Sequence, residues 1–298
     1  STPENRLSFR EILFSSHGMK DYIGGVILYD ETINQISSTG KSIPNLISSS
    51  GAVPGIKVDT GAKDLANSPK EKVTEGLDGL RDRLKKYYDL GARFTKWRGV
   101  YSIGENYPSK LAISSNAHAL ARYSALVQEN GMVPIVEPEV LMDGNHSAEV
   151  CFNKTSEVIK KCFEELILHK VDLSGIILKP NMILSGNLSE NKISSEEVSI
   201  KTLECLKNCV PNEVPGIAFL SGGQSEIEAT ENLNLINKNN NTNFIMTYSY
   251  GRALQQSALK VWSNDIKNVE AAQTTFNHRA KMCTLAAQGK WSSELENK

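Results

Sequence analysis

The stretch Gly175–Met182, GIILKPNM, runs through three branched apolar residues to a single lysine, Lys179, which stands before a proline. Most of six other short segments share its form: they are apolar on both faces and end in polar residues. Strands of this kind are typical of a parallel sheet that helices cover on its faces. The six segments are 24–30 (GGVILYD), 53–59 (VPGIKVD), 94–100 (FTKWRGV), 132–139 (MVPIVEPE), 216–223 (GIAFLSGG) and 244–251 (FIMTYSYG).

Longer amphipathic segments lie between these strands and predict helices. One follows the capping-box sequence Ser194-Ser195-Glu196-Glu197 and runs to about Cys209. The others cover residues 3–15, 72–90, 110–130, 224–238 and 265–288. Strand and helix alternate at intervals of roughly 30 to 43 residues, which indicates right-handed βαβ units.

Two architectures fit this alternation, a closed (β/α)8 TIM barrel and an open doubly wound sheet. No GxGxxG sequence follows a strand, and polar residues crowd the carboxyl ends of strands all along the chain. A barrel opens every such end onto one mouth, whereas an open sheet uses mainly its switch point. We therefore predict an α/β fold in which residues 1–298 form a single TIM-barrel domain. Only seven strands are found, so either the first strand of the barrel lies outside this sequence or one strand is not recognised among the segments above.

Composition excludes several classes of protein. The chain has 33 basic and 34 acidic residues, so its formal charge of −1 gives no global attraction to nucleic acid or to an anionic membrane. No apolar run approaches the ~20 residues of a membrane span. The five cysteines form no CxxC pair and are expected to be reduced thiols, and the five histidines show no metal-ligand spacing.

The polar residues at the strand ends form the candidate site. In a parallel barrel they all point toward one pocket, and residues two apart on a strand share a face. Each has a plainer explanation when taken singly, such as a solvated strand end, a structural ion pair or a tight turn. Their recurrence on six successive strands favours a site. They are Lys57 with Asp59, Lys96 with Arg98, Glu137 with Glu139, Lys179, Ser221 with Gly222 and Gly223, and Ser249 with Gly251 and Arg252.

These residue types suggest carbonyl chemistry on a phosphorylated substrate. An amine in an apolar pocket beside a second ammonium loses its proton more easily, so Lys179 near Lys96 suits a Schiff-base nucleophile. Glu137 can donate and accept the protons that this reaction needs. The segments SGGQSE (221–226) and YGRAL (250–254) lead from glycine-containing turns into helix starts, whose backbone N–H groups can hold a phosphate. Lys57 and Arg98 offer a second cationic patch for a second phosphate.

The chain resembles class I fructose-1,6-bisphosphate aldolase along nearly its whole length, from about Asn5 to Trp291. The resemblance is carried in order by GGVIL, GIKVD, GLDGL, KWR, ARYS, VPIVEPE, LKPNM, FLSGGQSE, LNLIN and YGRALQ. It implies a metal-independent, cofactor-free lyase of glycolysis and gluconeogenesis, cytoplasmic and usually a homotetramer. It also implies a sugar bisphosphate substrate, cleaved to dihydroxyacetone phosphate and glyceraldehyde 3-phosphate.

The resemblance further implies roles for matching residues. Lys179 of LKPNM forms the Schiff base, and Glu137 of VEPE transfers protons with support from Glu139. Lys96 of KWR assists at the same centre. Substrate phosphates are implied to be bound by two groups of residues: Lys57 and Arg98 toward the 6-phosphate, and Ser221, Gly222, Gly223, Ser249, Gly251 and Arg252 at the 1-phosphate.

The sequence departs from the family at both ends. The family's first strand, with a catalytic aspartate, and its C-terminal tyrosine are not matched here. We expect both to belong to the natural protein; a polypeptide that truly starts at Ser1 is expected to fold poorly or to be nearly inactive.

Two other functions stay open at this stage. One is a Schiff-base lyase on the same barrel that acts on monophosphates, against which Lys57 and Arg98 argue. The other is a binding or scaffold role, because aldolases of this family also bind actin and the cytoplasmic tails of membrane proteins. Neither nucleic-acid binding nor membrane insertion is expected.

Overall fold

Seven parallel strands form the main sheet of the computed structural model, which describes residues 2–297. Their order in the sheet is β1-β2-β5-β6-β7-β8-β9, so each strand pairs with the next strand of this sheet along the chain, and β3 and β4 form a separate sheet. The strands are β1 (Gly25–Leu28), β2 (Val53–Lys57), β5 (Phe94–Tyr101), β6 (Val133–Val140), β7 (Ile177–Leu178), β8 (Gly216–Phe219) and β9 (Ile245–Tyr248). All seven predicted strands are confirmed.

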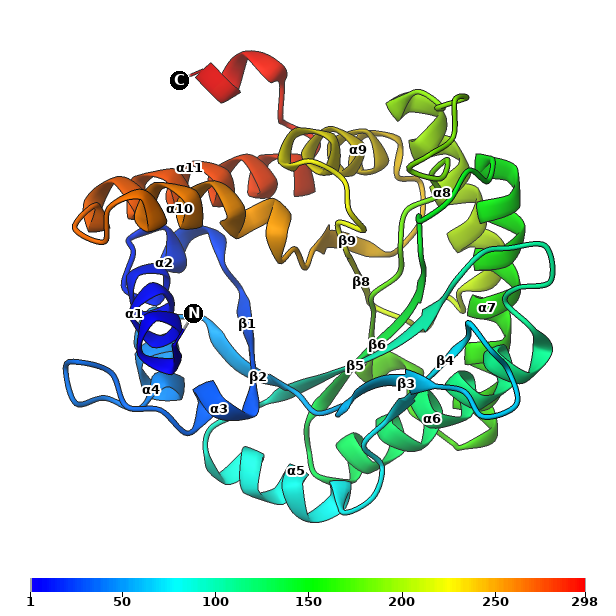
Figure 1. The fold of residues 1–298 in the computed structure, drawn as a ribbon, viewed down its shortest axis with the longest axis horizontal. Helices are drawn as coiled ribbons and strands as arrows, with labels where there is room; N and C mark the ends of the chain where they lie inside the picture. Colours follow the sequence, from blue (N-terminus) through cyan, green and yellow to red (C-terminus); the bar gives the residue numbers. More distant parts are fainter. Residues whose placement is uncertain (1, 298) are drawn as a thin grey trace.

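Helices cover the outside of the curled sheet (Figure 1). They are α1 (Pro3–Phe14), α2 (Gly18–Tyr22), α3 (Asp30–Ile33), α4 (Ile43–Ser49), α5 (Leu80–Asp89), α6 (Lys110–Glu129), α7 (Ala148–Leu168), α8 (Ser195–Cys209), α9 (Glu226–Asn239), α10 (Arg252–Asn264) and α11 (Val269–Ala287), with 3-10 turns η1 (Leu173–Gly175) and η2 (Ser293–Asn297). Every crossover contains a helix, and the helices lie on the outside of the curled sheet, so the fold is that of a (β/α)8 barrel, as predicted. Among residues 2–297 seven of the eight strands are present, and β1 does not pair with β9.

The predicted helix over residues 72–90 is wrong in its first half. Residues Lys72–Glu75 instead form strand β4, which pairs antiparallel with β3 (Gly61–Asp64) in a two-stranded hairpin. Gly76 and Gly79 have φ values of +126° and +65°, which break the helical path before α5 begins at Leu80. The helix-like spacing of apolar residues runs across these two glycines, but their left-handed φ values keep the backbone from forming one continuous helix.

The sheet interior and the inner faces of the helices form the hydrophobic core. Trp97, Ile56 and Phe219 are fully buried in strands, while Leu84 and Leu120 bury the inner faces of α5 and α6. All five cysteines lie in this buried region as free thiols, as predicted. Among the described residues, no helix has the length and apolarity required to cross a membrane.

Candidate active site

The neighbouring strands β5, β6 and β7 bring together Lys96, which lies within β5, Glu137, which lies within β6, and Lys179, which directly follows β7. Glu137 Oε1 lies 3.1 Å from Lys179 Nζ, and Glu137 Oε2 lies 3.0 Å from Lys96 Nζ. The side chain of Glu137 is 4% exposed, and each lysine side chain is 10% exposed. One carboxylate from β6 is therefore shared by the ammonium groups of two lysines from the neighbouring strands.

Strand β7 ends where the sequence demands it. Pro180 has no backbone N–H to continue the ladder, so the regular strand stops after Leu178. The Lys179 N–H still donates to the Val136 carbonyl oxygen at 2.7 Å, which fixes the backbone beside β6. The lysine side chain therefore leaves from a backbone position held between an apolar strand and a rigid proline.

Burial lowers the pKa of Lys179 below its ordinary value of 10.5, and the like charge of Lys96 lowers it further. The Glu137 carboxylate offsets part of this shift. For Glu137 itself, burial raises the pKa, but the ammonium groups of Lys179 and Lys96 outweigh burial and leave its pKa below 4.5. The carboxyl is thus ionised at neutral pH beside an amine that loses its proton unusually easily.

A second ion network lies on β2, β5 and β6. Arg98 Nε donates to Glu139 Oε2 at 2.5 Å, and Lys57 Nζ donates to Asp59 Oδ1 at 2.5 Å. Asp59 Oδ2 also accepts from the Arg98 backbone N–H at 3.4 Å, so it joins the two pairs. These residues alternate in sign around the mouth of the barrel.

The loops after β8 and β9 hold the predicted glycine and serine residues. Gly222 and Gly223 have φ values of +54° and +81°, so the turn needs residues that tolerate the left-handed region. The turn leads into α9, and Gly251 is the N-cap residue of α10. The Ser249 N–H donates to the Phe219 carbonyl oxygen at 2.8 Å, which joins the two strand ends.

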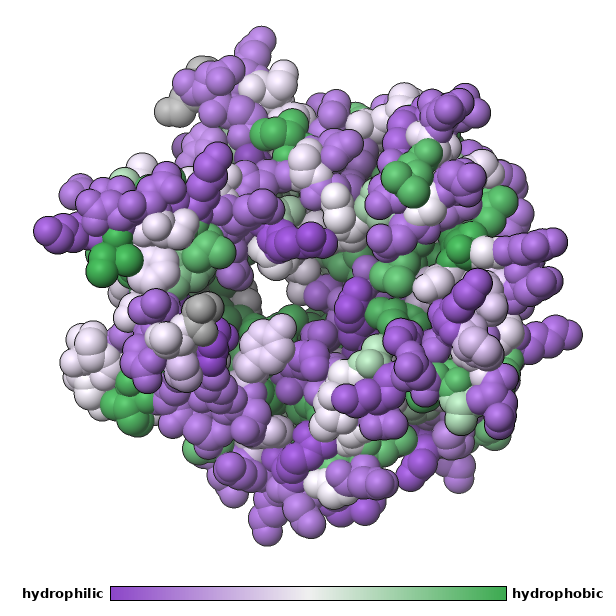
Figure 2. Space-filling model, viewed as in Figure 1, coloured by the Kyte–Doolittle hydropathy of each residue, from purple (hydrophilic) through white to green (hydrophobic). Residues whose placement is uncertain are grey.

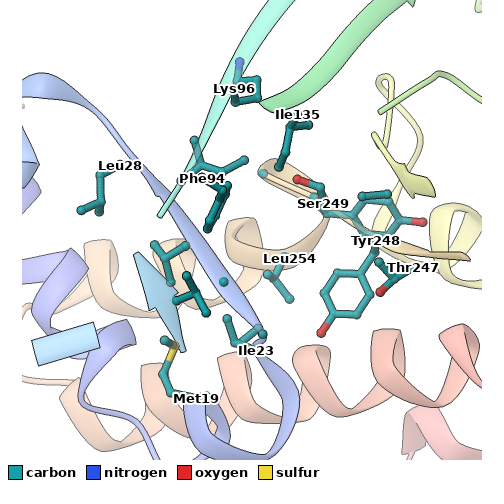
Figure 3. Close-up of a pocket in the computed structure, with 18 of the residues that line it drawn as sticks. Met19, Ile23, Leu28, Phe94, Lys96, Ile135, Thr247, Tyr248, Ser249 and Leu254 are labelled. Carbon is teal, nitrogen blue, oxygen red and sulfur yellow. The ribbon is translucent and has the colours of Figure 1, made fainter. Parts of the chain in front are cut away.

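A cavity of about 980 Å³ opens beside this cluster. Its polar lining includes Lys57, Lys96, Lys179, Ser249 and Gly251. Figure 3 shows part of its wall, with Phe94, Ile135, Tyr248 and Leu254 around the space and Lys96 at one end. In the space-filling view this face of the molecule has a deep opening with hydrophilic residues around much of its rim (Figure 2).

The other predicted site residues are not among those that line the cavity. They are Arg98, Glu137, Glu139, Ser221, Gly222, Gly223 and Arg252. Glu137 instead forms an ion pair with Lys96, which lines the cavity, and Glu139 forms one with Arg98 at the mouth. Ser221, Gly222 and Gly223 follow strand β8. The structure places Lys96, Arg98, Glu137 and Glu139 within β5 and β6 and Lys179 directly after β7, while the predicted serines and glycines lie in the loops after β8 and β9. Their individual roles stay predictions.

Two further residues support the site, and sequence reasoning gave them no role. Asp59 was noted at a strand end, and its side chain is only 3% exposed. Asn181 Oδ1 accepts from the Val140 N–H at 2.9 Å, while its amide donates to Thr155 Oγ1 at 3.0 Å. It therefore ties the ends of β6 and β7 to α7. The signal available in the sequence for Asn181 was its place in LKPNM, two residues after Lys179.

Comparison with known proteins identifies the group to which this arrangement is similar. A family model described as "Fructose-bisphosphate aldolase class-I" matches residues 1–298. A probable fructose-bisphosphate aldolase class 1 of Xanthomonas campestris pv. campestris is 50% identical over 292 residues, which are 98% of this chain and 87% of the relative. The cytosolic fructose-bisphosphate aldolase 4 of Arabidopsis thaliana is 48% identical over 293 residues, 98% of this chain and 75% of the relative.

A solved structure agrees with these relatives. It is fructose-bisphosphate aldolase from Plasmodium falciparum, in complex with TRAP and a small-molecule inhibitor. The TM-score is 0.96 at 44% sequence identity, and the match covers 98% of this chain and 85% of that one.

Proposed function

This chain belongs to the class I fructose-bisphosphate aldolase family, whose members are metal-independent lyases of glycolysis, and we propose that it cleaves fructose 1,6-bisphosphate through a Schiff base on Lys179. The observation that carries the proposal is the shared carboxylate: Glu137 lies within 3.1 Å of both Lys179 and Lys96. An aldol cleavage through an imine needs a neutral amine, a proton-transfer group and a nearby cation, and these three residues supply them.

The first stage forms the imine. Neutral Lys179 Nζ attacks the C2 carbonyl carbon of the open-chain ketose and yields a carbinolamine. Glu137, which has taken a proton from the lysine, returns one to the carbinolamine hydroxyl, and water leaves. The product is a protonated imine, with the nitrogen lone pair now in the C=N bond. Lys96 stabilises the Glu137 carboxylate when it is ionised.

The second stage breaks the C3–C4 bond. A base removes the C4 hydroxyl proton, C4 becomes the aldehyde carbon of glyceraldehyde 3-phosphate, and the bonding electrons move to the iminium nitrogen. The resulting enamine is protonated at C3, and water hydrolyses the imine to release dihydroxyacetone phosphate and the free lysine. The protonated imine serves as the electron sink, because it withdraws electrons more strongly than a ketone.

The substrate phosphates are proposed to bind at two places on the mouth. The turn with Gly222 and Gly223 leads into α9, and Gly251 is the N-cap residue of α10, so backbone N–H groups at two helix starts are proposed to hold the 1-phosphate. Lys57 and Arg98 are proposed to bind the 6-phosphate end. Two cationic places separated across one mouth favour a bisphosphate over a monophosphate.

The remaining proposals concern the whole chain. A hydrophobic core that includes residues of α1 and α11 supports one domain over residues 1–298. The names of plant relatives, such as the cytosolic aldolases 4 and 6 of Arabidopsis thaliana, support a cytoplasmic location. A homotetramer is proposed from the family, and native mass spectrometry measures it. A protein partner at the surface is proposed from the complex of the Plasmodium falciparum enzyme with TRAP.

Chemical trapping tests the Schiff base directly. Dihydroxyacetone phosphate plus borohydride is expected to leave one reduced adduct on the peptide that contains Lys179, as measured by peptide mass spectrometry. In Lys179→Ala the adduct and more than 99% of turnover are expected to disappear, since covalent catalysis is removed (a loss on the order of 10²-fold or greater). EDTA is expected to leave activity unchanged.

The control is Lys20→Ala, an exposed lysine on α2, which should trap normally. Full turnover by Lys179→Ala, or an adduct on another lysine, would contradict the proposal. A comparison of fructose 1-phosphate with the bisphosphate separates this function from that of a monophosphate lyase. Equal kcat/KM for the two substrates would favour the monophosphate lyase.

A further inference from the structure

Two histidines and a glutamate lie together on the outer helices, apart from the residues of the candidate active site. His118 belongs to α6, Glu165 belongs to the last turn of α7, and His169 directly follows α7. One ring nitrogen of each histidine and one carboxylate oxygen lie within 4.8 Å of one another. Because α6 packs against α7, the cluster spans the seam between two neighbouring helices.

The spacing of these atoms fits a small metal ion. His118 Nδ1 lies 3.3 Å from Glu165 Oε2, and the two histidine rings meet edge to face with centroids 4.9 Å apart. Ligand atoms at about 2.0–2.1 Å from a tetrahedral zinc ion stand about 3.3–3.5 Å from each other. The first pair already has this separation, and His169 Nδ1 lies 3.9 Å from the same Glu165 oxygen.

The ring of His169 is already oriented by the backbone. Its Nδ1 lies 2.8 Å from the Glu165 carbonyl oxygen, and a carbonyl only accepts, so Nδ1–H donates and Nε2 keeps its lone pair. Metal-binding histidines commonly donate their second ring N–H to a carbonyl in this way. Glu165 and His169 also stand four residues apart, which puts them on one side of the helix end.

Glu165 turns one of its two carboxylate oxygens toward the histidines. Lys161 Nζ pairs with Oε1 at 3.1 Å, so Oε2 is the atom that faces His118. The side chain of His118 is 51% exposed, so a hydrated ion can reach the cluster and keep water as a further ligand.

We propose that His118, Glu165 and His169 bind a divalent transition-metal ion, with Zn²⁺ as the test ion, and that the ion links α6 to α7. Imidazole and carboxylate ligands together suit Zn²⁺, Cu²⁺ and Ni²⁺ rather than Mg²⁺ or Ca²⁺. The site shares no residue with the strand-end cluster, so the ion acts on stability and not on aldol chemistry.

Isothermal titration calorimetry of the full chain with ZnCl₂, after removal of metals by EDTA and dialysis, tests the site. One ion per chain is expected for the unaltered protein. The variants His118→Ala and Glu165→Gln are each expected to bind the ion at least about tenfold more weakly. The matched control is His17→Ala, an exposed histidine at the start of α2, which should bind as the unaltered chain does.

Thermal unfolding gives an independent measurement. Saturating Zn²⁺ is expected to raise the Tm of the unaltered chain and of His17→Ala by a few degrees (an order-of-magnitude expectation for binding to the native state alone), and to leave the Tm of His118→Ala unchanged. Circular dichroism verifies that each variant is folded. Equal zinc affinity in the unaltered chain and His118→Ala, or no binding by the unaltered chain, would overturn the proposal.

Discussion

Glu137 is shared by two ammonium groups, and this sharing sets the protonation of Lys179. If Lys96 were absent, the carboxylate would belong wholly to Lys179, and the like charge that lowers the lysine pKa would be gone. Both changes favour the charged amine, which cannot attack a carbonyl. Lys96 therefore acts on the nucleophile through the carboxylate as well as through its own charge.

The variant Lys96→Met is expected to shift the pH midpoint of Schiff-base formation upward, toward the ordinary lysine value of 10.5. The lysine pKa is depressed in the folded protein, so the reactive neutral form gains population as pH rises through a value below 10.5. The measurement is the rate of borohydride trapping between pH 6 and about pH 10, the range over which a shifted lysine titrates.

Lys57→Met is the matched control, because Lys57 pairs with Asp59 and makes no ion pair with Glu137. It is expected to raise KM for the bisphosphate and to leave the midpoint where it is. A midpoint in Lys96→Met that equals that of the unaltered chain would mean that Lys96 does not set the lysine pKa.

At the scale of elements, two helices begin with the same capping box but lie in different functional settings. Ser194 caps α8, and Ser225 caps α9; in each case the serine oxygen accepts from the N–H of a glutamate three residues on, and that glutamate accepts from the serine N–H. Only α9 directly follows the turn with Gly222 and Gly223. Comparing the two caps therefore separates the effect of a cap on stability from its effect on phosphate binding.

Ser194→Ala and Ser225→Ala are each expected to lower the free energy of unfolding by about 1 kcal/mol, the usual cost of a lost N-cap. Only Ser225→Ala is also expected to raise KM for the bisphosphate, since its cap holds the turn proposed to bind the 1-phosphate. Urea unfolding and steady-state kinetics on both variants provide the comparison. An equal change of KM in the two variants would remove the link to phosphate binding.

Sequence patterns predicted the strands that carry the site and missed several of the elements around them. Apolar strands such as 132–139 were recognisable because both faces are buried. The hairpin of β3 and β4 was missed since its short strands are mostly exposed and carry Lys63, Asp64 and Lys72. Helices α7 and α10 were not named, although the predicted helix start at YGRAL falls at the beginning of α10.

Contacts between distant segments were beyond the reach of a single sequence. Spacing along the chain cannot show that Asp59 joins Lys57 to Arg98, or that Asn181 ties β6 to α7. The histidine spacing likewise gave no hint that His118 and His169 meet, because they come from different helical segments. Chain order predicted which strands carry polar residues, while the side-chain partners needed the folded structure.

For the whole molecule, several buried carboxylates link stability to pH. Burial raises the pKa of Glu71, Glu137 and Glu296, but their partners outweigh burial and leave each pKa below 4.5. A carboxyl with a depressed folded pKa contributes stability above its unfolded pKa, and this contribution is lost as pH falls through the folded pKa. Stability should therefore be constant near pH 7 and fall below about pH 4.5.

The expected result is a urea midpoint that is lower at pH 4 than at pH 7, with a smaller difference in Glu296→Gln. Glu296 accepts from both Arg279 nitrogens at 2.7 and 2.8 Å and from Trp291 Nε1 at 2.7 Å, so it is a clear contributor. The midpoint of urea unfolding, followed by tryptophan fluorescence, measures the effect. A midpoint unchanged or higher at pH 4 would contradict it.

The charged residues at the mouth create a locally positive field that the net charge of the whole chain does not reveal. The chain as a whole carries −1, yet the cations at the strand ends outnumber the carboxylates even when Lys179 is neutral. The cations are Lys57, Lys96, Arg98, Lys179 and Arg252, and the carboxylates are Asp59, Glu137 and Glu139. A doubly phosphorylated sugar is thus drawn to this end of an otherwise nearly neutral particle, and dissolved salt slows its arrival by screening that pull.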